Sequence, residues 1–153
     1  MTTLSAQTLL TRELLARRRP GYSLEAPFYL SETILQTDMG HIFGKHGIFV
    51  AVEPQVPEAG DYITVDFGTN SILIVRDDDM NIQAFHNVCR HRGSRLVDGA
   101  AGCAKKLVCP YLAWTYDRDG RLTGVPDSAS YPTLDKAKAS LVPVGLEQWR
   151  GFW

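Results

Sequence analysis

Two short segments of the chain carry side chains that bind metals. In the first, CRHRG, a thiolate at Cys89 and an imidazole at His91 stand two positions apart. The second, CPYLAW, begins with Cys109, and 17 residues separate it from His91. Because thiolate and imidazole both suit iron and zinc, two loops with this spacing can close over one inorganic centre. Leu112 has no lone pair, although a nitrogen donor at that position would complete the set.

The third cysteine, Cys103, lies between these segments. An odd count of three cysteines favours metal binding or burial over a disulfide framework. A free cysteine most often behaves as a small buried apolar residue. The alternative is a third thiolate, which would create a Cys₃His site for a single iron or zinc ion from Cys89, His91, Cys103 and Cys109.

Composition excludes several classes of function. The chain has 153 residues, 44% of them hydrophobic and 22% charged, with a net charge of −1. This charge gives no broad basic field for nucleic acid. No apolar run reaches the roughly 18–20 residues that span a membrane, and the N-terminus does not resemble a secretory signal. We therefore expect a cytoplasmic protein, and the apolar ending RGFW suggests a piece of a longer one.

Hydrophobic periodicity predicts two helices followed by many short strands. The first helix is expected from a cap at Ser5 to about Arg18, and the second from after Ser31 to about Phe43. The runs that follow are typical of strands: GIFVAVEP, DYITVDFG, NSILIVRD, NIQAFHN, KLVCP, AWTYD, RLTGVP and LVPVGLEQW. We expect a mainly β protein, a small antiparallel sandwich or barrel, with a helical segment at 1–45 and the β domain at 46–153.

The two metal-binding segments resemble a known signature. Cys-x-His, a gap of this length and Cys-x-x-His are typical of the Rieske [2Fe–2S] domain, and NVCRHRGSRL and CPYLAWTYDRDGRLTGVP resemble its cluster loops in ring-hydroxylating oxygenases. The resemblance places these loops at about 87–98 and 107–120. It implies that Cys89 and Cys109 hold one iron, and that His91 and a second histidine hold the other.

The second histidine of that signature would stand at position 112, which is Leu112. Because the neighbouring residues otherwise match, we interpret Leu112 as a single introduced replacement, so that the chain is an engineered variant. The outer iron would then keep one position open to water or an anion. We expect an incomplete, labile cluster.

The resemblance also implies a function. A Rieske domain of an oxygenase α-subunit takes electrons from a reductase or ferredoxin and passes them to a mononuclear iron in a catalytic domain, often in a neighbouring subunit. That iron needs two histidines and a carboxylate, and the chain has no histidine after Cys109, so it is not catalytic alone. The parent protein would be an oxygenase or demethylase, and the sequence resembles the group that acts on quaternary ammonium compounds.

Two alternatives remain open. The first is a structural or engineered Cys/His site for one zinc or iron ion. The second is an interaction domain with incidental cysteines, which would bind no stoichiometric metal. Metal and sulfide analysis separates the three.

Overall fold

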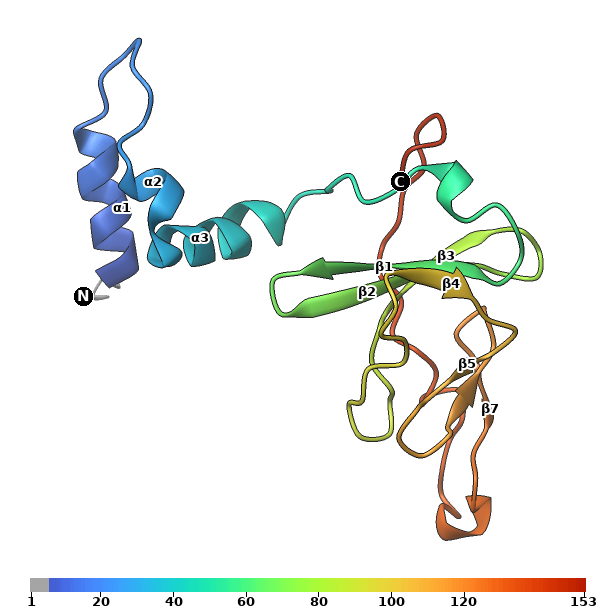
Figure 1. Cartoon of the computed structure of the whole chain (residues 1–153). Helices are drawn as coiled ribbons and strands as arrows, with labels where there is room; N and C mark the ends of the chain where they lie inside the picture. Colours follow the sequence, from blue (N-terminus) through green and yellow to red (C-terminus); the bar gives the residue numbers. More distant parts are fainter. Residues whose placement is uncertain (1–5) are drawn as a thin grey trace. The chain divides into compact units, whose positions relative to one another are not determined.

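The computed structural model describes residues 6–153 and divides the chain into two compact units, Met1–Ile48 and Phe49–Trp153 (Figure 1). The first unit is helical and the second contains every strand among the described residues. None of the described helices is long and apolar enough to cross a bilayer.

The helical unit contains α1 (Ala6–Ala16), α2 (Pro27–Leu30) and α3 (Glu32–Asp38). A π-helical turn, η1 (Met39–Phe43), continues directly from α3, so the second predicted helix is present but changes its winding near the end. The single turn of α2 was not predicted, although a proline suits the first position of a helix. The cap expected at Ser5 lies outside the described residues.

The larger sheet has four antiparallel strands: β1 (Asp61–Phe67), β2 (Asn70–Arg76), β3 (Ile82–His86) and β4 (Ala101–Cys103). Their order is β3-β2-β1-β4. A smaller antiparallel sheet joins β5 (Leu107–Val108), β6 (Thr115–Tyr116) and β7 (Leu122–Gly124) in chain order. Two 3₁₀ turns, η2 (Glu53–Gln55) and η3 (Ser128–Ser130), complete the elements. The predicted mainly β, antiparallel class with preceding helices is confirmed.

The central strand β2 supplies side chains to two hydrophobic clusters. Leu73 and Val75 belong to one cluster and Ile74 to the other, as the alternation of side chains along a strand requires. The first cluster packs the larger sheet against the smaller one, and it contains Cys89 and Cys109. The two cysteines therefore lie in the packed interior between the sheets.

Three strand predictions need correction. The runs GIFVAVEP and LVPVGLEQW form no named strand and make only isolated bridges, such as Val52 with Phe152 and Phe85 with Pro143. Both runs contain proline, which has no backbone N–H to donate to a ladder. Conversely, β4 was missed because its sequence, Ala-Gly-Cys, has low strand propensity; it forms by pairing with β1 along Asp61–Ile63.

Candidate metal centre

Two loops of equal length project from the smaller sheet and from the end of β3. The first loop (residues 89–94) lies between the paired residues Val88 and Arg95, and the second loop (109–114) lies between Val108 and Thr115. Within the first loop, the Cys89 N–H donates to the Ser94 carbonyl at 2.7 Å, and the Gly93 N–H donates to the Cys89 carbonyl at 3.0 Å.

The second loop repeats this pattern of backbone hydrogen bonds. The Cys109 N–H donates to the Trp114 carbonyl at 2.8 Å, and the Ala113 N–H donates to the Cys109 carbonyl at 3.0 Å. Each loop thus closes on its own leading cysteine, and the two frames are equivalent, residue by residue, at an offset of 20. The two segments predicted as cluster loops therefore share the same internal hydrogen bonds.

The fifth residue of each loop has a left-handed backbone. Gly93 has φ +72° and Ala113 has φ +53°. Glycine adopts this conformation freely, whereas a residue with a Cβ atom is strained by about 1–2 kcal/mol. Ala113, next to Leu112, therefore holds a strained backbone conformation.

The two loop cysteines are buried and face each other. Cys89 is 2% exposed and Cys109 is 3% exposed. Burial opposes ionisation of the Cys109 thiol, but hydrogen bonds from the backbone N–H groups of Leu112 and Tyr111 and from the Cys89 thiol outweigh it, so the pKa of Cys109 falls below its usual value. The second loop therefore stabilises a thiolate at Cys109.

Tyr116 supports the other cysteine. Its hydroxyl oxygen lies 3.4 Å from the Cys89 sulfur and accepts the Arg90 N–H at 3.1 Å. Burial, followed by the hydrogen bond with Cys89, raises the pKa of Tyr116 well above its ordinary value, so the phenol stays protonated. Since its oxygen already accepts from Arg90, its proton is available to the Cys89 sulfur. The Tyr116 side chain is fully buried, and its contact with Cys89 joins segments 27 residues apart, so the sequence alone gives no sign of it.

His91 is fixed by two aromatic residues. Its ring stacks on Trp114 of the second loop, with centroids 4.6 Å apart and planes 4° from parallel. Its Nε2 atom lies 3.1 Å from the Tyr131 hydroxyl. Tyr131 also presents its edge to both rings, at 5.6 Å from His91 and 5.8 Å from Trp114. Sequence analysis missed Tyr131 because it stands in a polar loop without a metal-binding pattern.

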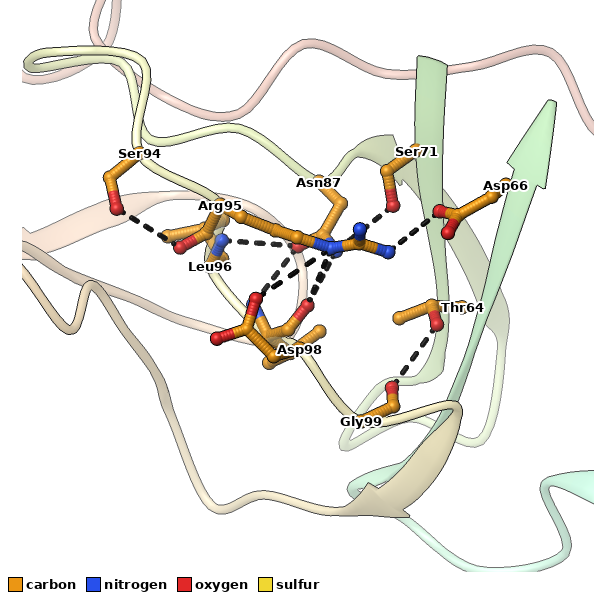
Figure 2. Close-up of polar contacts among 10 residues, drawn as sticks. Thr64, Asp66, Ser71, Asn87, Ser94, Arg95, Leu96, Asp98 and Gly99 are labelled. Carbon is orange, nitrogen blue, oxygen red and sulfur yellow. Dashed lines mark hydrogen bonds and ion pairs between the residues drawn. The ribbon is translucent and has the colours of Figure 1, made fainter. Parts of the chain in front are cut away.

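Asn87 anchors the first loop to β2 and to the chain that follows the loop (Figure 2). Its amide nitrogen donates to the Ser71 hydroxyl at 3.2 Å and to the Val97 carbonyl at 2.7 Å. Its carbonyl oxygen accepts the N–H groups of Leu96 and Val97, at 3.2 and 3.1 Å. The side chain is fully buried, so these four bonds replace the water that it would otherwise bind.

The arginines around the first loop do not act alike. Arg95 forms an ion pair with Asp66 at 2.6 Å and donates to the Val97 carbonyl at 3.2 Å, both drawn in Figure 2. Arg95 thus links the end of the first loop to β1, although its side chain stays 37% exposed. Arg90 and Arg92 are exposed, and no ion pair is recorded for either within residues 6–153.

The two remaining candidate positions, Leu112 and Cys103, are exposed to solvent. Leu112 is 40% exposed, so its side chain faces solvent in part. Cys103 is exposed on the edge strand β4, and the pKa of its thiol is raised mainly by its hydrogen bond with Asp61. Among the described residues, no three His, Cys, Asp or Glu side chains form a group that could hold one metal ion. The structure therefore gives no support to the Cys₃His set with Cys103.

The donors that are present fit part of a binuclear cluster. The two buried thiols are hydrogen-bonded to each other and backbone N–H groups stabilise one of them, while His91 stands on the first loop without forming a three-donor group with them among the described residues. A [2Fe–2S] cluster of the Rieske type takes two cysteines on one iron and two histidines on the other. By residue type alone, Cys89, Cys109 and His91 correspond to three of these ligands, and Leu112 carries no donor atom in its side chain.

Comparison with known protein families matches residues 46–138 to the Rieske [2Fe–2S] domain. The match covers more than half of the chain, and the chain belongs to this family. The relatives it resembles are oxygenase subunits. It is 46% identical over 142 residues to the glycine betaine monooxygenase oxygenase subunit of Chromohalobacter salexigens, covering 93% of this chain and 32% of the relative.

Other relatives support the same class. The carnitine monooxygenase oxygenase subunit of Escherichia coli K12 is 34% identical over 152 residues, covering 99% of this chain and 41% of the relative. A crystal structure of naphthalene 1,2-dioxygenase from Rhodococcus sp. bound to indole superposes with a TM-score of 0.86 at 28% identity, covering 98% of this chain and 35% of that one. The chain thus spans between 32% and 41% of the length of these relatives.

Proposed function

We propose that this chain is the electron-transfer domain of a larger Rieske oxygenase, with Cys89, Cys109 and His91 as the protein ligands of its cluster. When bound, a [2Fe–2S] cluster accepts and releases one electron at a time. The observation that carries the proposal is the pair of buried, facing cysteines on two loops with the same backbone frame. A family match centred on the same residues supports it.

The neighbouring side chains would serve this role by holding the ligands still. Tyr116 donates to the Cys89 sulfur, and the N–H groups of Tyr111 and Leu112 stabilise negative charge on Cys109. Hydrogen bonds of this kind to the ligating sulfurs make an added electron less unfavourable. Trp114 excludes water from one face of His91.

Position 112 distinguishes this chain from the Rieske signature, which has a histidine there. With leucine there, the outer iron would have His91 as its sole protein ligand and a coordination position open to solvent. Because Leu112 is 40% exposed, water or a small anion can reach that position. We expect the metal to be held at least 10–100-fold more weakly than with a complete set, the range found when a ligand loses a supporting partner.

We further propose that the full-length protein acts on a quaternary ammonium compound and receives electrons from a reductase or ferredoxin. The two named relatives act, by their names, on glycine betaine and carnitine, which share that group. Arg90 and Arg92 flank His91 with free positive charge, which favours an acidic electron donor and predicts a salt-sensitive encounter. Catalysis would require the mononuclear iron of a catalytic domain in the parent protein.

The test is iron and acid-labile sulfide per chain after anaerobic reconstitution, together with the visible spectrum. The proposal predicts two irons and two sulfides in the chain as it stands, roughly none in Cys109→Ser, and an unchanged content in the control Cys103→Ser. Zinc or iron without sulfide would instead establish a single-ion site. If the chain binds no stoichiometric metal, the remaining alternative is an interaction domain with incidental cysteines.

A further inference from the structure

We propose that Tyr131 is a positioning residue that selects which ring nitrogen of His91 is free to bind metal. In this role the Tyr131 hydroxyl accepts the Nε2 proton of His91 and leaves the lone pair of Nδ1 for the iron. The inference rests on the proposed function for the identity of the metal, but the tautomer of His91 can be measured without any metal.

Tyr131 reaches the site from a segment that belongs to neither loop. It follows the turn η3, and its backbone is fixed there, since its N–H donates to the Ser128 carbonyl at 3.0 Å and its carbonyl accepts the Leu134 N–H at 3.1 Å. Its side chain packs against the first hydrophobic cluster, which contains both loop cysteines. The hydroxyl is therefore held in place before any ligand arrives.

The geometry makes the two nitrogens of His91 unequal. The hydroxyl of Tyr131 lies 3.1 Å from Nε2, and no hydrogen bond is recorded for Nδ1 within the described chain. A 180° flip of the ring would exchange the nitrogens and break this bond. The parallel stack on Trp114 and the perpendicular edge of Tyr131 confine the ring between two aromatic surfaces. Because both aromatic contacts survive such a flip, the hydrogen bond to Tyr131 is what distinguishes the two orientations of the ring.

A neutral imidazole carries its proton on one nitrogen and a lone pair on the other. Metal-binding histidines almost always donate their second ring N–H to a neighbouring acceptor, which fixes the tautomer and the ring orientation. A tyrosine hydroxyl can accept that proton, and Tyr131 is the polar group that contacts the ring here. In a chain with leucine at position 112, His91 has no partner imidazole to share the task, so this support matters more.

The tautomer can be read by nitrogen NMR of the full chain labelled at histidine, without metal, at about pH 8.5, where ordinary histidines are neutral. The chain has four histidines, and the His91→Gln variant identifies the signals of His91. We expect a protonated Nε2 and an unprotonated Nδ1 in the chain as it stands. In Tyr131→Phe, the two forms should mix. A proton on Nδ1 before substitution, or an unchanged tautomer after it, would overturn the proposal, and the first of these needs no variant to fold.

A second readout connects the tautomer to metal binding. After reconstitution with iron and sulfide, Tyr131→Phe should lose iron to a chelator about tenfold faster or more, the lower end of the range for such supporting groups. The matched control is Tyr29→Phe, which removes an exposed hydroxyl from the helical unit and should lose iron at the original rate. Equal rates in all three proteins would contradict the role of Tyr131. If none of them binds a cluster, the proposed function fails, while the NMR result still decides the tautomer.

Discussion

The first and second loops share one backbone frame and differ in the side chains that the frame presents. Each is closed by the same two hydrogen bonds to its cysteine. The first loop has a donor, His91, and a glycine at its left-handed position, whereas the second has Leu112 and an alanine at the equivalent position. The backbone conformation of such a loop therefore does not depend on its metal-binding side chain, because the second loop keeps the same hydrogen bonds with leucine in place of a donor.

The anchoring of the first loop gives the largest expected effect. Asn87→Ala removes four hydrogen bonds and leaves two backbone N–H groups, those of Leu96 and Val97, without their acceptor. Because unpaired buried donors cost about 1–3 kcal/mol each, we expect a loss of about 3 kcal/mol in the free energy of unfolding, measured by urea titration. Asn70→Ala, at an exposed site on β2, should change it by less than about 0.5 kcal/mol. Similar losses in both variants would refute the anchoring role.

Introducing a donor into the second loop tests the difference between the loops directly. Leu112→His should retain iron against a chelator at least 10–100-fold longer than the chain with leucine, because the outer iron gains a second protein ligand. The release of iron is measured as the loss of visible absorption over time. The control Leu112→Gln adds a polar side chain of similar length without an imidazole. Equal retention in all three chains would mean that position 112 does not face the metal.

Substitutions at the left-handed positions of the two loops should change the free energy of unfolding in opposite directions. Ala113→Gly relieves the strain at φ +53° and is expected to raise the free energy of unfolding by about 1 kcal/mol. Gly93→Ala, at φ +72°, should lower it by a similar amount; the added Cβ meets no atom within 4 Å, so the effect is that of the backbone alone. Paired thermal melts measure both. Changes of the same sign would show that the frames are not equivalent.

The smallest effect concerns acid stability near the second loop. Hydrogen bonding to Lys106, followed by the opposing effect of burial, leaves the pKa of Asp117 below its ordinary 3.8. Because the folded pKa is depressed, Asp117 stabilises the fold fully above about pH 3.8, and this contribution is lost as the pH falls through the folded value. Asp117→Asn should therefore be less stable by about 1 kcal/mol or less at neutral pH, with the gap closing in acid. A gap that persists at low pH would contradict this sign.

Some of this arrangement could be predicted from the sequence, for identifiable reasons. Cys89, His91 and Cys109 carry a rare spacing, and the long runs that became β1, β2 and β3 alternate strongly. The strand β4 was hidden because its residues have no strand preference, and only its partner β1 creates it. What the sequence could not predict is contact across distant segments.

Tyr131 illustrates that limit. It lies 40 residues from His91, in a stretch of ordinary polar composition, and only folding brings its hydroxyl to the ring. Ala113 illustrates another: an alanine carries no sign of strain until its φ is known. Arg95 illustrates a third limit, since its ion pair with Asp66 depends on the position of β1.

The central claim is that one imidazole, that of His91, faces the iron where the family places two. Electron–nuclear double resonance of the reduced, reconstituted chain counts the histidine nitrogens that are coupled to the iron–sulfur cluster. The account predicts one such nitrogen in this chain, none in His91→Gln and two in Leu112→His. Two coupled nitrogens in the chain as it stands would contradict it, because another histidine would then fill the place that Leu112 leaves open.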